Sequence, residues 1–242
     1  MYAGDVTHCA TSLFFGELLM RKTEDLGINN LKIIQDSDLF CFGTDSVLLS
    51  DFAKVPSGSM VLDLCTGNGI IPILMSAKSK NTVFTGIELQ EESYTLAEEN
   101  IKLNNLDDRI NMICDNIKNI KNYIKKGSVD IVTCNPPYMS VGSGFINPKS
   151  HLAIARHEIK CTLDDVISAV CDVIKFGGRF YMVHRSERLC DIIFNLRKNK
   201  LEPKRICFVH PSPDKAPGLV LTEAVYGAKP SLKIEKPIYV NI

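Results

Sequence analysis

The feature that most constrains the fold of this chain is a regular alternation of strand-like and helix-like segments that begins near residue 59. Apolar, β-branched runs predict strands over residues 60–64, 83–89, 110–114, 129–134 and 179–184. Between them, helices are expected from the turn at 66–69 to about residue 78 and over 91–103, 164–175 and 187–198, with Phe176-Gly177-Gly178 ending the third of these. This alternation predicts βαβ units and a mostly parallel sheet, that is, an α/β fold.

The C-terminal part of the sequence has a different pattern. Two β-like runs, residues 206–210 and 219–227, flank a Pro- and Gly-containing segment at 211–218, which predicts an antiparallel hairpin. We find no internal repeat or linker, so we expect one domain over residues 59–242, preceded by an N-terminal extension over 20–58.

The first nineteen residues contain no Lys or Arg. A secretory signal begins with a positive segment and a mitochondrial transit peptide is rich in Arg, so neither type of targeting sequence is indicated. We expect Met20 to be the natural start and residues 1–19 to be a non-native leader.

The composition, with 45% hydrophobic residues among 242, excludes disordered, collagen-like and coiled-coil classes. The apolar runs are far shorter than the ~18 residues of a membrane span. Nine cysteines are spaced at least ten residues apart, so the chain has no C-x-x-C zinc motif. Their odd number and their apolar surroundings predict reduced, buried thiols of a cytoplasmic protein, and we expect no metal site.

A glycine-rich turn, Asp63-Leu64-Cys65-Thr66-Gly67-Asn68-Gly69, follows the first core strand and precedes a helix. Glycines at such a turn let the backbone approach a ligand. A dinucleotide fingerprint would have a third glycine at position 72, which is Pro72 here, and no carboxylate at position 63. Asp63 would repel a pyrophosphate but suits an ammonium group, which disfavours a nicotinamide oxidoreductase.

Acidic and amide residues lie at the ends of the next two strands. Glu88 comes 21 residues after Gly67, where a carboxylate accepts hydrogen bonds from ribose hydroxyls. Asp115 and Asn116 follow the third strand, where they can contact an adenine amino group. The predicted ligand is a nucleoside with a positively charged amino-acid arm and no phosphates, and S-adenosylmethionine fits this description. The alternative is that these residues are only turn glycines and helix caps.

The segment Asn135-Pro136-Pro137-Tyr138 follows the fourth strand. The prolines end the strand and hold the backbone extended, at the edge where open α/β sheets bind ligands. The Asn135 amide oxygen and the Pro136 carbonyl are then two fixed acceptors, which suits a planar –NH₂ group. Tyr138 offers a flat face on which a base can stack.

These motifs together resemble the class I S-adenosylmethionine-dependent methyltransferases that methylate exocyclic nitrogens, and in particular the bacterial tRNA(Val) adenine-N6 methyltransferase family. The resemblance extends from about Met20 to Ile242. Further segments that carry it are Ile33-Ile34-Gln35, the run from Phe42 to Leu49, Ala155-Arg156-His157-Glu158, Leu221-Thr222-Glu223-Ala224 and Gly227-Ala228-Lys229. It implies a Rossmann-like fold whose mostly parallel seven-stranded sheet ends in a C-terminal antiparallel hairpin, and N6-methylation of an anticodon-loop adenosine of tRNA.

The motifs and the resemblance together predict the site residues. Asn135, Pro136 and Tyr138 are expected to be catalytic. The residues expected to bind the cofactor are Gly43, Thr44, Asp45, Asp63, Cys65, Thr66, Gly67, Asn68, Gly69, Glu88, Leu89, Asp115, Asn116 and Asn135. The resemblance places Gly43 to Asp45 over the methionine end of the cofactor. Cys65 stands where the family has glycine, so a side chain would face the cofactor there.

Three other functions are compatible with parts of this pattern. A glutamine-amide methyltransferase acting on a protein such as a release factor also uses Asn-Pro-Pro-Tyr, but such enzymes carry a sizeable helical N-terminal domain. Only about forty residues separate Met20 from the first core strand. A ribosomal-RNA guanine-N2 methyltransferase is disfavoured by Tyr138. A cofactor-binding protein without catalysis would leave residues 135–138 unexplained.

The net charge of zero, from 28 basic and 28 acidic residues, conceals two halves of opposite sign. Residues 175–242 hold 13 Lys and Arg against 6 Asp and Glu, a net of +7, and residues 1–174 hold 15 against 22, a net of −7. The basic residues Arg197, Lys198, Lys200, Lys204, Arg205 and Lys215 are predicted to bind RNA phosphates. The alternative is that they only solvate a helix end and a hairpin.

Overall fold

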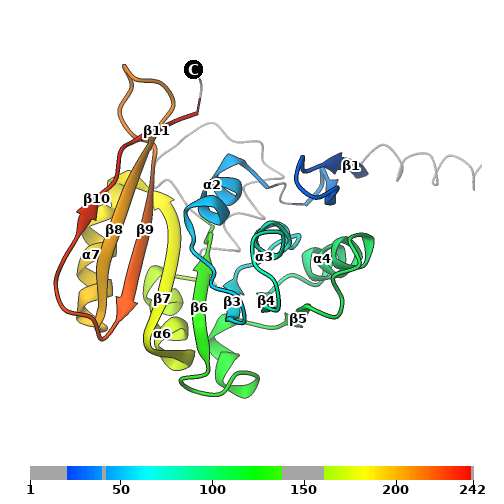
Figure 1. The fold of residues 1–242 in the computed structure, drawn as a ribbon, viewed down its shortest axis with the longest axis horizontal. Helices are drawn as coiled ribbons and strands as arrows, with labels where there is room; N and C mark the ends of the chain where they lie inside the picture. Colours follow the sequence, from blue (N-terminus) through cyan, green and yellow to red (C-terminus); the bar gives the residue numbers. More distant parts are fainter. Residues whose placement is uncertain (1–20, 40–41, 138–160, 241–242) are drawn as a thin grey trace, which may run out of the picture.

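The computed structural model describes residues 21–39, 42–137 and 161–240 (Figure 1). The leader expected over residues 1–19 and the predicted catalytic residue Tyr138 lie outside these ranges.

One twisted sheet forms the centre of the molecule (Figure 1). Its seven principal strands are β3 (Met60–Leu64), β4 (Val83–Glu88), β5 (Ile110–Cys114), β6 (Val129–Cys134), β7 (Ile174–Arg185), β8 (Leu201–His210) and β9 (Leu219–Tyr226). Their order is β8-β9-β7-β6-β3-β4-β5, with β3 to β7 mutually parallel and β9 antiparallel to both of its neighbours. Two short strands, β10 (Lys233–Ile234) and β11 (Ile238–Tyr239), pair with β8. The predicted α/β class, parallel sheet and C-terminal hairpin are confirmed.

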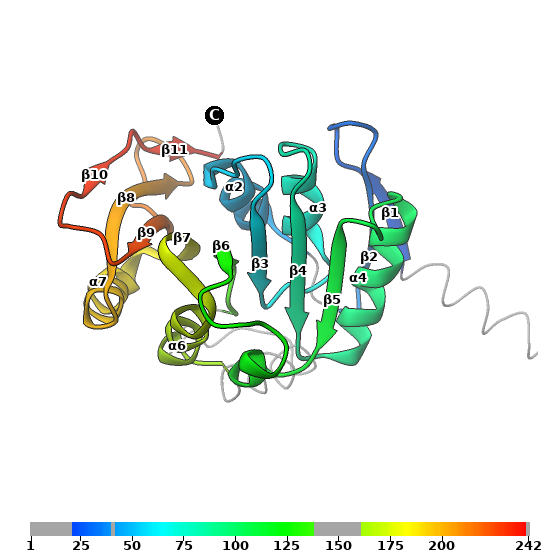
Figure 2. The same cartoon turned by 60° about the horizontal axis from the view of Figure 1, so that its bottom comes forward.

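Helices cover both faces of the sheet (Figure 2). One face packs against α2 (Thr44–Phe52), α3 (Ile70–Ser76) and α4 (Glu91–Leu103). The other packs against α6 (Leu163–Val173), α7 (Leu189–Lys198) and the 3-10 helix η1 (Ile117–Asn122), while a 3-10 turn, η2 (Ser186–Arg188), precedes α7. Each face has its own buried apolar core, as expected for a parallel sheet covered on both sides. Among the described helices, none is long and apolar enough to span a membrane.

The sequence pattern predicted that the glycine pair at 177–178 ends a helix, and this prediction is wrong. Helix α6 already ends at Val173, and β7 begins at the next residue. Val129 of β6 pairs with Ile174 and Ile131 pairs with Arg179, so β7 has three extra residues between these two pairs. Gly177, at φ +78°, lies in this irregular part of the strand. A glycine after an apolar run serves a helix end and a β-bulge equally well, and the pattern does not distinguish them.

The cysteines are free thiols wherever the structure describes them, but they are less uniformly buried than predicted. Cys134 and Cys207 are buried, whereas Cys114 and Cys190 are exposed. Cys114 ends β5, which is the edge strand of the sheet in the part of the chain that the structure describes.

An N-terminal hairpin, β1 (Arg21–Asp25) with β2 (Lys32–Asp36), packs on α4 (Figure 2). Two asparagines, Asn100 in α4 and Asn104 at its C-terminal cap, bind the backbone of β2 on the side away from β1. The Asn104 side chain accepts from the Lys32 N–H (2.8 Å) and donates to the Lys32 carbonyl (2.7 Å). The fully buried Asn100 bonds Ile34 in the same way, at 2.6 and 3.1 Å, and its NH₂ group also donates to the Asn68 carbonyl in the glycine-rich turn (3.0 Å).

We therefore expect Asn100→Ala to lower the free energy of unfolding by about 2 kcal/mol or more, because it leaves buried backbone groups of β2 and of the turn without partners. The matched variant Asn104→Ala should cost less than about 1 kcal/mol, because water can replace its bonds at this more accessible position. Urea denaturation followed by circular dichroism measures both values. Equal losses for the two variants would contradict this account.

Candidate active site

The strand order places the predicted site residues at one edge of the sheet. After β3 the chain goes to β4 and β5 on one side and then returns to β6 on the other, so the order reverses between β3 and β6. Leu64 pairs with Cys134 at the carboxyl ends of these two strands. The glycine-rich turn and Asn135 therefore leave the sheet side by side, at the type of crevice where α/β proteins bind ligands.

Asp63, near the end of β3, is 1% exposed. Thr133 on the adjacent strand donates to Asp63 Oδ1 at 2.6 Å, whereas Oδ2 is buried and has no hydrogen-bond partner among the described residues. Burial, with a smaller effect from the nearby Glu88 carboxylate, raises the pKa of Asp63 to about 7, although hydrogen bonds from Thr133 and Thr66 oppose the shift. A buried carboxylate oxygen without a donor is suited to a cationic ligand group.

The glycine-rich turn is held in a left-handed conformation at three positions. Cys65, Gly67 and Gly69 have φ values of +58°, +59° and +86°. Cys65 is the residue for which this conformation costs about 1–2 kcal/mol. The turn also depends on Gly86 of β4, which the sequence analysis did not single out: a Cβ there would lie 2.7 Å from the Thr66 hydroxyl oxygen. The absence of a side chain at position 86 lets the turn pack directly on the sheet.

Glu88 ends β4 and is 6% exposed. One carboxylate oxygen accepts from the Gly67 N–H at 2.9 Å, and the other accepts from the Gln90 N–H at 3.0 Å. Glu88, which the sequence predicts to bind ribose hydroxyls, therefore lies beside the glycine-rich turn. Each oxygen retains a second lone pair that can accept a hydroxyl hydrogen.

Asp115 and Asn116 follow β5 at the same edge, where the Asp115 N–H donates to the Glu88 carbonyl at 3.0 Å. The Asp115 carboxylate also accepts from the Tyr123 hydroxyl at 2.7 Å, and this bond is the main reason that its pKa is lowered. Asn116 caps η1 by accepting from the Lys118 N–H at 3.0 Å. Both residues thus have structural roles: Asp115 is an anion held by hydrogen-bond donors, and Asn116 is a helix cap.

The first turn of α2 contacts the segment after β6. The Asn135 side-chain NH₂ donates to the Ser46 hydroxyl at 2.9 Å, which joins residues 89 positions apart. Gly43, just before this helix, permits the Asp45 carboxylate to fold back, because a Cβ on Gly43 would lie 2.8 Å from it. The structure therefore brings the predicted group Gly43 to Asp45 close to Asn135. The sequence analysis missed Ser46, because no local pattern marks it.

Three cysteine residues also meet near this edge. The sulfur of Cys65 lies 3.8 Å from that of Cys161, just before α6. Interaction with the neighbouring Cys134 and burial raise the pKa of the Cys65 thiol well above its usual value. The thiols are therefore protonated at neutral pH and are poor nucleophiles. Within the described ranges, no three His, Cys, Asp or Glu side chains are arranged to hold a metal ion.

His184, at the carboxyl end of β7, is buried. Its Nδ1 accepts from the Arg185 N–H at 2.8 Å, and burial lowers its pKa to about 4. The ring is therefore neutral near pH 7.

The basic residues predicted to bind RNA do not gather at this edge. Strand β8 starts opposite Tyr226 and ends opposite Leu219, which itself pairs with Arg185 at the carboxyl end of β7. Arg197, Lys198 and Lys200, which precede β8, are therefore exposed at the opposite, amino edge, whereas the exposed Lys215 lies in the turn at the carboxyl edge.

Two other members of that set make internal contacts. Arg205 is only 17% exposed, forms an ion pair with the buried Glu223, and donates to the Phe52 carbonyl at 2.8 Å. Lys204 donates to the Lys229 carbonyl at 3.1 Å. The position of Arg205 is thus explained by its contacts within the protein.

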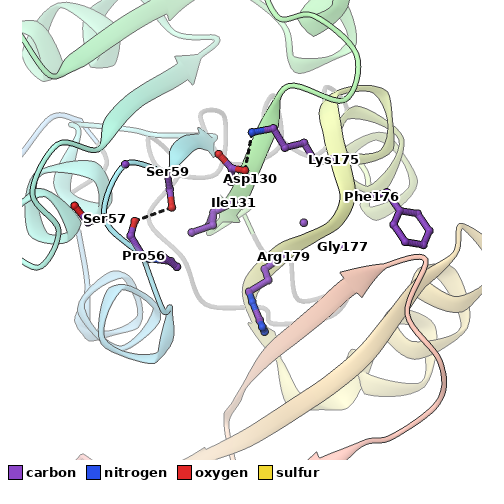
Figure 3. A pocket seen from close by; sticks show the side chains of 11 residues that line it. Pro56, Ser57, Ser59, Asp130, Ile131, Lys175, Phe176, Gly177 and Arg179 are labelled. Atoms are coloured by element: carbon purple, nitrogen blue, oxygen red, sulfur yellow. Dashed lines mark hydrogen bonds and ion pairs between the residues drawn. The ribbon is translucent and has the colours of Figure 1, made fainter.

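A cavity of about 380 Å³ lies at the amino edge, away from the predicted site residues. It is lined by residues 56–59, 130–131 and 175–179. Figure 3 shows Lys175 pointing to Asp130, with which it forms an ion pair at 2.6 Å, while Phe176 points away from the cavity. None of the polar groups described above lines this space.

Comparison with known proteins agrees with this geometry. Residues 56–218 match the family described as "Methyltransferase domain". The chain belongs to this methyltransferase domain family. It is 27% identical over 187 residues to the tRNA1(Val) (adenine(37)-N6)-methyltransferase of Porphyromonas gingivalis, which covers 75% of this chain and 72% of the relative. The enzyme of the same name from Parabacteroides distasonis is 28% identical over 210 residues, covering 81% and 84%. The resemblance inferred from the sequence motifs is confirmed.

Solved structures show the same fold. A predicted O-methyltransferase from Agrobacterium tumefaciens superposes with a TM-score of 0.65 at 18% identity, covering 81% of this chain and 86% of that one.

The raised pKa of Asp63 predicts a specific dependence of stability on pH. Between about pH 4 and pH 7 the unfolded chain loses the Asp63 proton while the folded protein keeps it, so the folded state is stabilised at low pH and loses this stability as the pH rises through 7. We expect the free energy of unfolding of the wild type to fall relative to that of Asp63→Asn over this range. Denaturant titrations at a series of pH values measure the difference. If the difference does not vary with pH, Asp63 ionises normally in the folded protein.

Proposed function

We propose that this methyltransferase uses S-adenosylmethionine to methylate the N6 amine of an adenine in RNA, specifically an anticodon-loop adenosine of tRNA. The observation that carries the proposal is the position of Asn135-Pro136 next to the glycine-rich turn, at the point where the strand order reverses. Two groups that would hold a methyl donor and a target amine thereby share one edge of the sheet.

The residues present fit S-adenosylmethionine. Asp63 Oδ2, which has no partner among residues 21–39, 42–137 and 161–240, would accept from the ammonium group of the donor, and Glu88 would accept from its ribose hydroxyls with the lone pairs that the backbone bonds leave. Asp115 and Asn116 would lie by its adenine. The other cofactor residues proposed are Gly43, Thr44, Asp45, Cys65, Thr66, Gly67, Asn68, Gly69 and Leu89. When bound, the donor would supply an electrophilic methyl group, whose bond to sulfur breaks as the new N–C bond forms, so that S-adenosylhomocysteine is the leaving group.

The residues after β6 hold the target amine in this proposal. The Asn135 Oδ1 and the Pro136 carbonyl accept its two hydrogens and direct the nitrogen lone pair to the methyl group. Positive charge develops on the nitrogen as it attacks, so these acceptors stabilise the transition state more than the neutral amine. The product nitrogen then loses its proton to water, so that no dedicated base is needed. His184 is not needed as that base: its Nδ1 already accepts from the Arg185 N–H, and its low pKa makes the ring a weak base.

The choice of tRNA rests on the relatives, whose names specify adenine 37 of tRNA1(Val). In the proposed complex the adenine leaves its stack in the loop, as bases do for enzymes that act on them, and stacks on Tyr138. Lys215 would contact the RNA backbone, because it is the member of the predicted basic set at the methyl-transfer edge. We further propose that residues 59–242 form the catalytic domain and that 20–58 complete its cofactor site, in a cytoplasmic enzyme.

The proposal predicts that deletion of the gene removes N6-methyladenosine from tRNA. Nucleoside mass spectrometry of purified tRNA from wild-type, deletion and complemented strains measures this loss, and complementation should restore the modification. If tRNA is unchanged while a release factor loses a methylated glutamine, the protein is a glutamine-amide methyltransferase instead.

Asn135→Ala should retain the wild-type affinity for S-adenosylmethionine within about threefold but lose methyl transfer by at least about a hundredfold, because it removes one acceptor of the target amine. Isothermal titration calorimetry measures cofactor binding, and methyl incorporation into tRNA from the deletion strain measures turnover. The matched control is Asn111→Ala, an exposed asparagine on β5. Undiminished turnover of Asn135→Ala would refute the assignment.

A further inference from the structure

The contact between Ser46 and Asn135 has a geometric consequence for the proposed reaction. Ser46 lies in the first turn of α2 and is 3% exposed. Its hydroxyl oxygen accepts from the Asn135 Nδ2 at 2.9 Å. The two residues are 89 positions apart in the sequence, so this bond forms only when α2 packs beside the end of β6.

An asparagine side chain has two chemically different ends of nearly the same shape. Its oxygen only accepts hydrogen bonds, and its NH₂ group only donates them. A target amine needs the oxygen end, since an amide turned by 180° would place its NH₂ group against another donor. Rotation of the terminal amide is soft, so a buried hydroxyl that accepts from the NH₂ end, as Ser46 does, holds the oxygen end in the other direction.

We propose that Ser46 is a positioning residue, which holds the NH₂ end of the Asn135 amide and thereby keeps its oxygen directed to the target amine. The inference rests on the proposed function and adds to it a residue that acts through Asn135 without touching substrate. It assigns to α2 a part in the methyl-transfer step, in addition to the proposed contact of its first residues with the cofactor.

Helix α2 is held firmly enough for this role. At its C-terminal end, the Phe52 carbonyl accepts from Arg205 at 2.8 Å, and the guanidinium lies 4.2 Å from the centre of the Phe52 ring. At its N-terminal end the Asp45 carboxylate accepts from the Ser46 N–H at 2.9 Å. These bonds hold the C-terminal end of α2 to β8 and order the backbone at Ser46, on the buried side of the helix.

The helix provides a matched control in Ser50, one turn after Ser46. Ser50 is 1% exposed, and its hydroxyl donates to the Val47 carbonyl at 2.8 Å, within α2 itself. Ser50→Ala therefore removes the same atom from the same buried helix with no contact to Asn135. Ser46→Thr retains the hydroxyl and serves as the conservative variant.

We expect Ser46→Ala to lower kcat for methyl transfer to tRNA by about ten- to a hundredfold, because a misplaced acceptor costs rate in the chemical step. The dissociation constant for S-adenosylmethionine, measured by calorimetry, and the KM for tRNA should stay within about threefold of the wild type. Ser46→Thr should recover most of the rate, and Ser50→Ala should retain it. A wild-type kcat in Ser46→Ala, or a loss explained by cofactor affinity or shared by Ser50→Ala, would overturn the inference.

A second measurement does not depend on activity. In protein labelled with ¹⁵N-asparagine, the side-chain NH₂ signals of Asn135 are those that disappear in Asn135→Ala. Ser46→Ala should shift these signals and Ser50→Ala should leave them in place, whereas unchanged signals in Ser46→Ala would overturn the inference. If the wild type methylates neither tRNA nor a release factor, the proposed function fails, while the NMR comparison still decides whether Ser46 holds Asn135.

Discussion

The packing of the sheet has to accommodate a row of buried or half-buried polar side chains that crosses its middle. Asp63, Thr133, Tyr181, Glu223 and Arg205 lie opposite one another on five neighbouring strands, from β3 to β8. Residues paired in this way point to the same face of a sheet. At one end of the row Thr133 donates to Asp63, and at the other the buried Glu223 pairs with Arg179 and Arg205. A buried carboxylate without such partners would be costly, so the row specifies how the strands and α2 fit together.

Helix α2 lies over part of this row, at Tyr181 and Arg205. Arg205 binds the last carbonyl of the helix, and the ring of Phe52 packs edge-on against Tyr181 with 6.1 Å between ring centres. The first turn of the same helix reaches Asn135. Arg205 was predicted from the sequence to bind RNA, yet its position links the C-terminal hairpin to the N-terminal segment. A basic residue in a charge-rich stretch looks the same in sequence whether it faces a phosphate or a buried Glu.

The accuracy of the sequence predictions follows the range of the interactions involved. The strand and helix alternation depends on local periodicity, and it predicted each principal strand and the α/β class. The glycine-rich turn, Glu88 and Asn135 were located because each lies at or just after the end of a strand, and parallel strands bring their carboxyl ends to a common edge. Gly177 was misassigned because a local pattern cannot show that β7 has three more residues than its partner between two paired positions. The roles of Asn100, Gly86 and Ser46 were missed because each is defined by a contact with a segment distant in sequence.

The sequence by itself determined the fold class, the methyltransferase motifs and the edge of the sheet where they meet. These depend on residue type and spacing along one strand and its following turn. Only the tertiary structure decided which groups share hydrogen bonds: that Asp63 Oδ2 is buried without a donor in the part of the chain that the structure describes, that Arg197, Lys198 and Lys200 lie at the edge opposite Lys215, and that Ser46 binds the Asn135 amide. The physical reason is that burial and hydrogen bonding are properties of packed surfaces, which form between elements that lie far apart along the chain.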